Sequence, residues 1–208
     1  ISMQDLTGER IDGTIDLFDS YHLRVPFSSS ATCERISYDE KTRTATFLIH
    51  IALMENKAFS GRKITFIVRQ FLSNKQEYHD TLPQIDWHTV SRTPQTQHDV
   101  NPRGGYGDND PAQLAFLAVQ PETSFSPVDG VTVTGTGFID GKLHVQAYYE
   151  NILETDNHGY VYMRHVDGST IQGESSVTFW DSERRGSYEE YVFDISPDEL
   201  MNYVPYGH

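Results

Sequence analysis

Acidic side chains are the first candidates for chemistry in this sequence. Glu150, Glu154 and Asp156 lie close together in one segment, and Glu189 and Glu190 are adjacent in another. Two carboxyl groups placed on either side of a glycosidic bond can hydrolyse it, one of them acting as the acid. Successive side chains of a β-strand point to opposite faces, however, so Glu189 and Glu190 are not expected to serve one bond.

Two short segments offer oxygen atoms of the kind that calcium prefers. They are Asp108-Asn109-Asp110 and the turn Asp156-Asn157-His158-Gly159. Neither contains the twelve-residue calcium-loop pattern, so we interpret both as turns closed by their own Asx side chains. The sequence alone does not decide whether the protein binds calcium.

Histidine and cysteine give no metal-binding pattern. His50, His88, His144, His158 and His165 are scattered through expected strands and turns, without the spacing of a metal site. Cys33 is the only cysteine, which excludes an intrachain disulfide and any cysteine-based zinc or iron–sulfur site. We therefore assign no metal ligand and no cofactor-binding residue, and we expect no cofactor.

Catalytic motifs are also missing. Gly135, Gly137 and Gly141 do not have the dinucleotide-binding spacing, and they lie in an expected hairpin, where turns and bulges require glycine. No phosphate-binding loop, His-Glu-x-x-His or Gly-x-Ser-x-Gly stretch occurs. Since no nucleophile comes with a base, we assign no catalytic residue and predict that the protein is not an enzyme.

Aromatic side chains are numerous in the second half of the chain. Tyr160 and Tyr162 share one face of an expected strand, and further members of the group are Tyr148, Tyr149 and Trp180. If exposed, these rings could stack on sugars or on a partner's apolar surface. We favour the core for them, because large aromatic residues dominate the interiors of sandwiches.

Charge excludes one class of partner. The formal net charge is −14, with 15 acidic and 12 basic residues before residue 121, and 15 and 4 after it. Such a surface repels phosphate backbones and anionic lipid, so nucleic acid is not an expected partner.

The elements that would position these residues are strands. Period-two alternation recurs along the chain, as in Thr42–Met54, which forms a hairpin with the strand around Arg35–Tyr38. Leu48 and Met54 suggest that the second face of this hairpin is partly covered. A second hairpin joins Val131–Ile139 to Lys142–Tyr149 through Asp140-Gly141, and Asp167-Gly168 offers another turn of the same kind. Ser196–Leu200, a capping box with proline at the first helical position, predicts a single helical turn.

The same pattern suggests a division of the chain. Thr89–Pro111 has no strand pattern, Leu114–Val119 could close a first sheet, and Pro121–Pro127 resembles a joint between domains. We predict an all-β protein of two tandem antiparallel β-sandwich domains with immunoglobulin-like architecture, residues 1–122 and 123–208. We also expect Asn101–Asp110 to be exposed and weakly ordered.

Several blocks of the sequence resemble one bacterial family. They are GTGFIDGKLHVQ (residues 135–146), TDNHGYVY (155–162), FWD (179–181), GSYEEY (186–191), FDISP (193–197) and FSGRKITF (59–66). The chain resembles the extracytoplasmic region of family 4179 of domains of unknown function. Members are membrane proteins of Gram-positive bacteria, often described as anti-sigma factors, and no catalytic or ligand residues carry across from them.

The resemblance implies a place and a role. It implies a non-catalytic sensor or protein-interaction region on the extracytoplasmic face of the cell membrane, whose partner is an unknown envelope protein or cell-wall ligand. The full-length protein would have one membrane helix outside this sequence, and the start Ile1-Ser2-Met3-Gln4 suggests a piece of a longer chain. The alternative is a carbohydrate or cell-wall adhesion module that uses the aromatic side chains.

Overall fold

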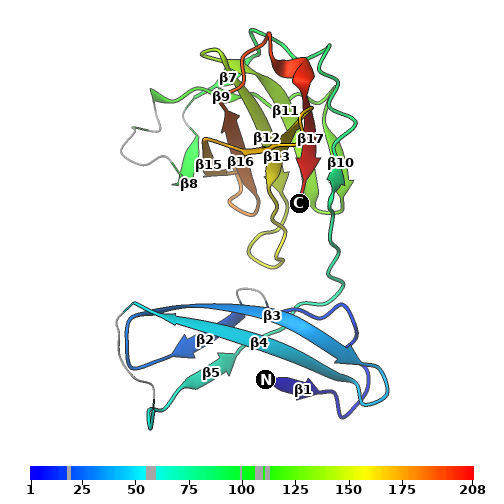
Figure 1. Cartoon of the computed structure of the whole chain (residues 1–208), viewed down its shortest axis with the longest axis vertical. Coiled ribbons are helices and arrows are strands. Elements are labelled where there is room, and N and C mark those ends of the chain that lie inside the picture. Colours follow the sequence, from blue (N-terminus) through cyan, green and yellow to red (C-terminus); the bar gives the residue numbers. More distant parts are fainter. Residues whose placement is uncertain (18–19, 55–59, 99, 106–109, 111–112) are drawn as a thin grey trace. The chain divides into compact units, whose positions relative to one another are not determined.

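The computed structural model shows an all-β protein made of two compact units (Figure 1). It describes residues 1–17, 20–54, 60–98, 100–105, 110 and 113–208. The units are Ile1–Gln76 and Glu77–His208, and all the named strands pair antiparallel. The predicted all-β class with antiparallel sheets is confirmed.

The boundary between the units differs from the predicted one. It lies between Gln76 and Glu77, not near residue 122. The segment Pro121–Pro127 is no joint, because Phe125–Val128 forms β10 at the edge of a sheet in the second unit. An edge strand tolerates Pro127, since its missing N–H is not needed for the ladder. Pro127 therefore indicates the edge of a sheet and not a linker between domains.

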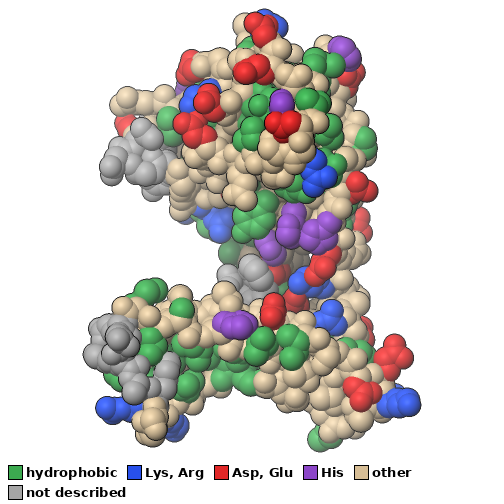
Figure 2. Space-filling view, in the orientation of Figure 1, with side chains coloured by type: hydrophobic (Ala, Val, Ile, Leu, Met, Phe, Trp, Pro, Cys, Tyr) green, Lys and Arg blue, Asp and Glu red, His purple; other side chains and the backbone are tan. Residues whose placement is uncertain are grey.

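The charge step is sharper at the observed boundary. The first unit contains 9 acidic and 10 basic residues, whereas the second contains 21 acidic and 6 basic ones. Acidic side chains lie at several places on the visible surface of the second unit, among hydrophobic and other side chains (Figure 2). The acidity of the protein is thus a property of one unit.

The first unit is built on one long hairpin. Its strands are β1 (Ser2–Gln4), β2 (Tyr21–Arg24), β3 (Ser29–Asp39), β4 (Thr44–Leu53) and β5 (Thr65–Val68). The strand order in its main sheet is β1-β4-β3, and β2 pairs with β5. The predicted hairpin is confirmed as β3–β4, with Ala45 and Phe47 buried on one face. Leu48 and Met54 are 39% and 65% exposed, so the expected cover on the other face is wrong.

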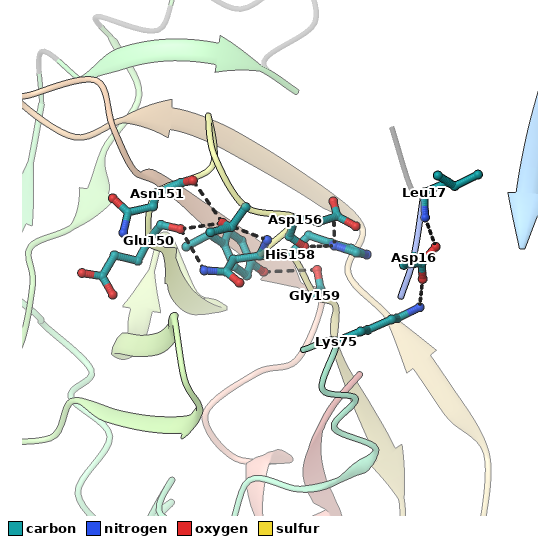
Figure 3. Close-up of polar contacts among 11 residues, drawn as sticks. Asp16, Leu17, Lys75, Glu150, Asn151, Asp156, His158 and Gly159 are labelled. Atoms are coloured by element: carbon teal, nitrogen blue, oxygen red, sulfur yellow. Dashed lines mark hydrogen bonds and ion pairs between the residues drawn. The ribbon is translucent and has the colours of Figure 1, made fainter. Parts of the chain in front are cut away.

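A buried aspartate, Asp16, lies beside the core of the first unit. Asp16 accepts hydrogen bonds from the Leu17 backbone N–H at 2.7 Å and from Lys75 Nζ at 2.6 Å (Figure 3). Ile15 and Leu17, on either side of it, are fully buried. The lysine therefore neutralises a carboxylate that the neighbouring apolar residues draw into the core.

The second unit is sandwich-like. Its strands are β6 (Asp80–Thr81), β7 (Thr96–Gln97), β8 (Asn101–Gly104), β9 (Phe116–Leu117), β10 (Phe125–Val128), β11 (Val131–Ile139), β12 (Lys142–Tyr149), β13 (Val161–His165), β14 (Thr170–Gln172), β15 (Ser175–Trp180), β16 (Ser187–Phe193) and β17 (Tyr203–Gly207). A six-stranded sheet, β10-β11-β12-β16-β15-β8, and a four-stranded sheet, β14-β13-β17-β6, share one core. Leu143, Val145 and Phe193 from the first meet Val161 and Met163 from the second.

A third layer covers the other face of the six-stranded sheet. The short strands β7 and β9 pair with each other, and Phe116 of β9 packs on Val177 and Phe179 of β15. Leu114–Val119 was expected to close a sheet of a first domain, and that prediction is wrong. Strand β8 also corrects the prediction that Asn101–Asp110 is weakly ordered, because residues 101–104 pair with β15. Residues 106–109 of that segment, including Asp108 and Asn109, lie outside the described residues.

Turn chemistry was the most predictable feature. Asp140 and Gly141 have φ of 52° and 79°, as a two-residue type I′ turn requires, which confirms the β11–β12 hairpin. At Asp167-Gly168 only the glycine has positive φ, so the β13–β14 turn is of a different, longer type. The helical turn predicted over Ser196–Leu200 is displaced: the 3-10 helix η3 spans Leu200–Asn202 and begins after Glu199, without a side-chain cap, while Ser196 Oγ donates to Glu199 Oε2 at 2.5 Å in the turn before it. No helix in the described part of the chain is long and apolar enough to cross a membrane.

The observed boundary predicts which fragment folds alone. Residues 77–208 should show a cooperative thermal transition, because they contain every strand of both sheets and the cover. Residues 123–208 should not, because they lack β6, β8 and β9. Circular dichroism of both fragments during heating tests this, and equal cooperativity of the shorter fragment would contradict it.

The Asp140-Gly141 turn predicts a second pair of results. Gly141→Val should lower the free energy of unfolding by about 1–2 kcal/mol, the cost of a left-handed conformation for a residue with a Cβ. No atom lies within 4 Å of a Cβ built at Gly141, so this penalty comes from the backbone alone. Asp140→Asn should be nearly neutral, because asparagine tolerates the same conformation. Chemical denaturation measures both, and a stable Gly141→Val protein would refute the role of the turn.

Candidate functional site

The four-stranded sheet has one buried and one exposed face. Val161 and Met163 of β13 and Pro205 of β17 are buried against the core, so the alternate side chains point outward. We call the outward set the tyrosine face, and it comprises Gln172, Thr170, Tyr160, Tyr162, Arg164, Val166, His208, Tyr206, Val204, Thr81 and His79.

Stacked rings form the middle of the tyrosine face. Tyr162 lies opposite Tyr206 in the register, and their ring centroids are 5.3 Å apart with an interplanar angle of 17°. The Arg164 guanidinium carbon lies 4.7 Å from the centroid of the Tyr206 ring. A cation over an aromatic ring contributes about 0.5–1 kcal/mol at an exposed site. The three side chains are therefore held in one arrangement without any ligand.

A second group of rings continues the face at the next register position. The backbones of Tyr160 and His208 exchange hydrogen bonds of 2.7 and 2.9 Å. The ring of His208 lies edge-on to Tyr160 at 6.3 Å and 4.1 Å from the ring of His79. Tyr160 is 62% exposed, so this end of the face is open to solvent.

The composition of the tyrosine face is unusual for this unit. None of its residues is Asp or Glu, although the second unit contains 21 of them, one of which, Glu77, lies beside His79 at the edge of the face. Val204 and Val166 are exposed next to Arg164. Protein-binding surfaces are enriched in aromatic residues and arginine, and they are depleted of Asp, Glu and Lys. The tyrosine face has this composition. The arrangement can bind a partner by stacking, apolar contact and one fixed positive charge.

A polar hollow of about 380 Å³ lies at the end of the six-stranded sheet. Its lining comprises Tyr148, Glu150, Asn151, Asp181, Ser182, Glu183 and Arg185. Asp181 accepts hydrogen bonds from Tyr148 Oη at 2.9 Å and from the backbone N–H of Arg185 and Gly186. Burial and the neighbouring Asp181 raise the pKa of Tyr148 to about 12. These contacts stabilise the β15–β16 turn. Asp181 and Tyr148, the titratable pair of this hollow, therefore have a structural role.

The predicted carboxylate cluster lies in the β12–β13 connection. Asn157 Nδ2 donates to the Glu150 carbonyl at 2.9 Å, and His158 Nδ1 lies 2.7 Å from the Asp156 carbonyl (Figure 3). The Asn157 bond runs from the side-chain amide to a carbonyl seven residues back, whereas an Asx turn is closed by a side-chain oxygen and the backbone N–H two residues on, so the Asx-type interpretation of this segment stays a prediction. The hydroxyls of Tyr149 and Tyr191 donate to the Gly159 carbonyl, and burial raises the pKa of both phenols. The loop is thus fastened to the core.

Glu190 is the most deeply buried carboxylate among the described residues, with 1% exposure. It faces the covering layer and accepts hydrogen bonds from the Leu117 N–H of β9 at 2.9 Å and from Gln146 Nε2 at 2.9 Å. His144 Nδ1 lies 2.7 Å from its other oxygen. Thr134 Oγ1 donates to Gln146 Oε1 and completes the network. Glu189 interacts with Tyr191 on the opposite face, as the strand period predicted.

The remaining predicted histidines are dispersed. His165 Nδ1 lies 3.0 Å from Asp167, His50 lies 4.0 Å from Glu34, and His88 is exposed. Within the residues that the structure describes, no three His, Cys, Asp or Glu side chains are gathered as a ready-made metal site. Cys33 packs against the core of the first unit, and burial raises the pKa of its thiol.

The aromatic group is divided between core and surface. Tyr149 is buried, as expected, and Tyr148 and Trp180 are half-buried, with Arg103 stacked on Trp180 at 4.9 Å. Tyr160 is exposed and Tyr162 lies on the outward face of β13, so the core assignment is wrong for these two residues. Tyr206, His79 and His208 were missed, because only the pairing of β13, β17 and β6 brings them beside Tyr160 and Tyr162. The alternation in Tyr203–Gly207 was the one available indication.

Comparison with known proteins gives no relative: no family model, no curated protein and no solved structure matches this chain. The resemblance to family 4179 of domains of unknown function therefore stays a prediction.

The Glu190 network predicts a large effect on stability. Glu190→Ala should lower the free energy of unfolding by about 3–5 kcal/mol, because buried N–H donors of Leu117, Gln146 and His144 lose their acceptor. Glu174→Ala is the control, since its ion pair with Lys142 is exposed and should contribute about 0–1 kcal/mol. Chemical denaturation measures both, and similar losses in the two variants would contradict the assigned role.

Proposed function

We propose that this protein is a non-catalytic sensor or protein-interaction region on the extracytoplasmic face of a bacterial cell membrane. It would belong to a membrane-anchored protein of the anti-sigma type, as the resemblance to family 4179 implies. The tyrosine face is the observation that carries the interaction role. The unit that bears it would be an immunoglobulin-like domain, which its two packed antiparallel sheets support.

The case for a protein partner rests on composition and order. Tyrosine and arginine supply most of the binding energy in protein interfaces, where a few ordered side chains dominate. Tyr162, Tyr206 and Arg164 are already stacked, so little conformational entropy is lost when a partner binds. The absence of carboxylates in the face lowers the desolvation cost of covering it.

The polar groups of the second unit support a role without chemistry. Asp181 and Tyr148 close a turn, Tyr149 and Tyr191 hold a loop, and Glu190 holds a covering strand. Each of these groups makes hydrogen bonds within the protein that its structure depends on.

A carbohydrate or cell-wall ligand is the alternative. Sugars bind to open ring faces, whereas one face of Tyr206 is stacked on Tyr162 and Arg164 also lies on this ring. The exposed ring of Tyr160 is the feature that favours the alternative. The present arrangement of rings favours a protein partner.

Binding variants test the proposal. Tyr206→Ala and Arg164→Ala should each weaken capture of an envelope protein at least tenfold, as expected for residues at the centre of an interface. Leu153→Ala is the matched control, because Leu153 is exposed on the β12–β13 connection outside the tyrosine face. Quantitative pull-down from envelope extracts measures capture, and thermal denaturation confirms that each variant is folded.

Two outcomes would contradict the proposal. The first is capture that is equal for the wild type and both face variants. The second is binding on a glycan array that the same variants abolish, which would identify the carbohydrate module instead.

A further inference from the structure

His79 and His208 are brought together by strand pairing alone. The register of β6 and β17 pairs Thr81 with Tyr206 and Asp80 with Gly207, so the next position places His79 opposite His208. Side chains opposite each other on antiparallel strands share a face. Their ring centroids are 4.1 Å apart, with an interplanar angle of 54°.

The spacing of the two rings fits a metal ion. Zinc binds imidazole nitrogen at about 2.0–2.1 Å, so two nitrogens on one ion are at most about 4 Å apart. Rings whose centroids are 4.1 Å apart reach this spacing by rotation about their side-chain bonds. The tilt of 54° also means that the rings are not locked in a parallel stack.

A carboxylate lies next to the histidine pair. Glu77 Oε2 is 3.9 Å from His79 Nε2, and both side chains are more than half exposed. Residues 77 and 79 are two apart in sequence, which places them on the same side of an extended chain. Water reaches this position, so it can occupy the coordination positions that protein side chains leave open.

His208, which directly follows β17, is held firmly. Two backbone hydrogen bonds join His208 to Tyr160, and the Tyr160 ring packs edge-on against the imidazole. Strand β6 is only two residues long and lies at the edge of its sheet. A metal bound to both histidines would therefore connect a short edge strand to a fixed one.

We propose that His79 and His208 bind a divalent transition metal of the zinc type through their imidazoles, with water completing the coordination. Imidazole is the ligand that zinc, copper and nickel share, whereas calcium and magnesium prefer oxygen. This inference does not depend on the proposed function, because it concerns two side chains and an ion and requires no partner.

Zinc titration of the full chain without an affinity tag tests the site. Calorimetry should show one equivalent of Zn²⁺ bound by the wild type. His79→Gln and His208→Gln should each weaken this binding at least tenfold. His88→Gln is the matched control, because His88 is an exposed histidine elsewhere in the same unit, and it should bind as the wild type does.

A measurement on the wild type keeps the test independent of variant folding. Nitrogen-15 spectra of the histidine side chains should show that Zn²⁺ shifts the resonances of two imidazoles together. The inference is overturned if no saturable binding occurs, or if either variant binds with wild-type affinity. If zinc does not bind but the partner is still captured, only the metal site is refuted. If zinc binds but no partner is captured, only the proposed function is refuted.

Discussion

The buried carboxylate of Glu190 is the constraint on which the second unit depends. A carboxylate with 1% exposure must have its oxygens satisfied inside the protein, since burial without partners costs several kcal/mol. Its partners come from two layers: Gln146 and His144 lie beside it in the six-stranded sheet, and the Leu117 N–H belongs to β9. The covering strand is therefore required, because without it the sheet would contain an unsatisfied charge. This requirement also explains why the unit begins well before residue 122.

The same network shows how far the sequence could be interpreted. Period-two alternation correctly separated Glu189 from Glu190, and the Asp140-Gly141 turn fixed the β11–β12 register. Both features are local, because a turn and a strand period are set by neighbouring residues. The partner of Glu190 could not be predicted, because Leu117 is 73 residues away and offers only its backbone N–H. Backbone donors have no signature in a sequence.

The wrong domain boundary has the same physical origin. Strands β6 and β8 are two and four residues long, and each is completed by a strand from the end of the chain, β17 and β15 respectively. Segments this short have too few residues to show a period. The tyrosine face was missed in part for this reason, because His79 and His208 become neighbours only through the β6–β17 pair. Charge gave better guidance than pattern, since the step between the units is real and only its position was misplaced.

Strand β13 shows how one short element serves the fold and the surface separately. Val161 and Met163 fill the core, while Tyr162 and Arg164 between them form the centre of the tyrosine face. Because the two sets alternate, changes to the outward side chains leave the buried contacts intact. The residues of the core and those of the surface can therefore vary independently. The acidic character of the unit reinforces this division. The unit contains 21 acidic residues and none of them belongs to the tyrosine face, so a partner that avoids carboxylates is directed to the stacked tyrosines.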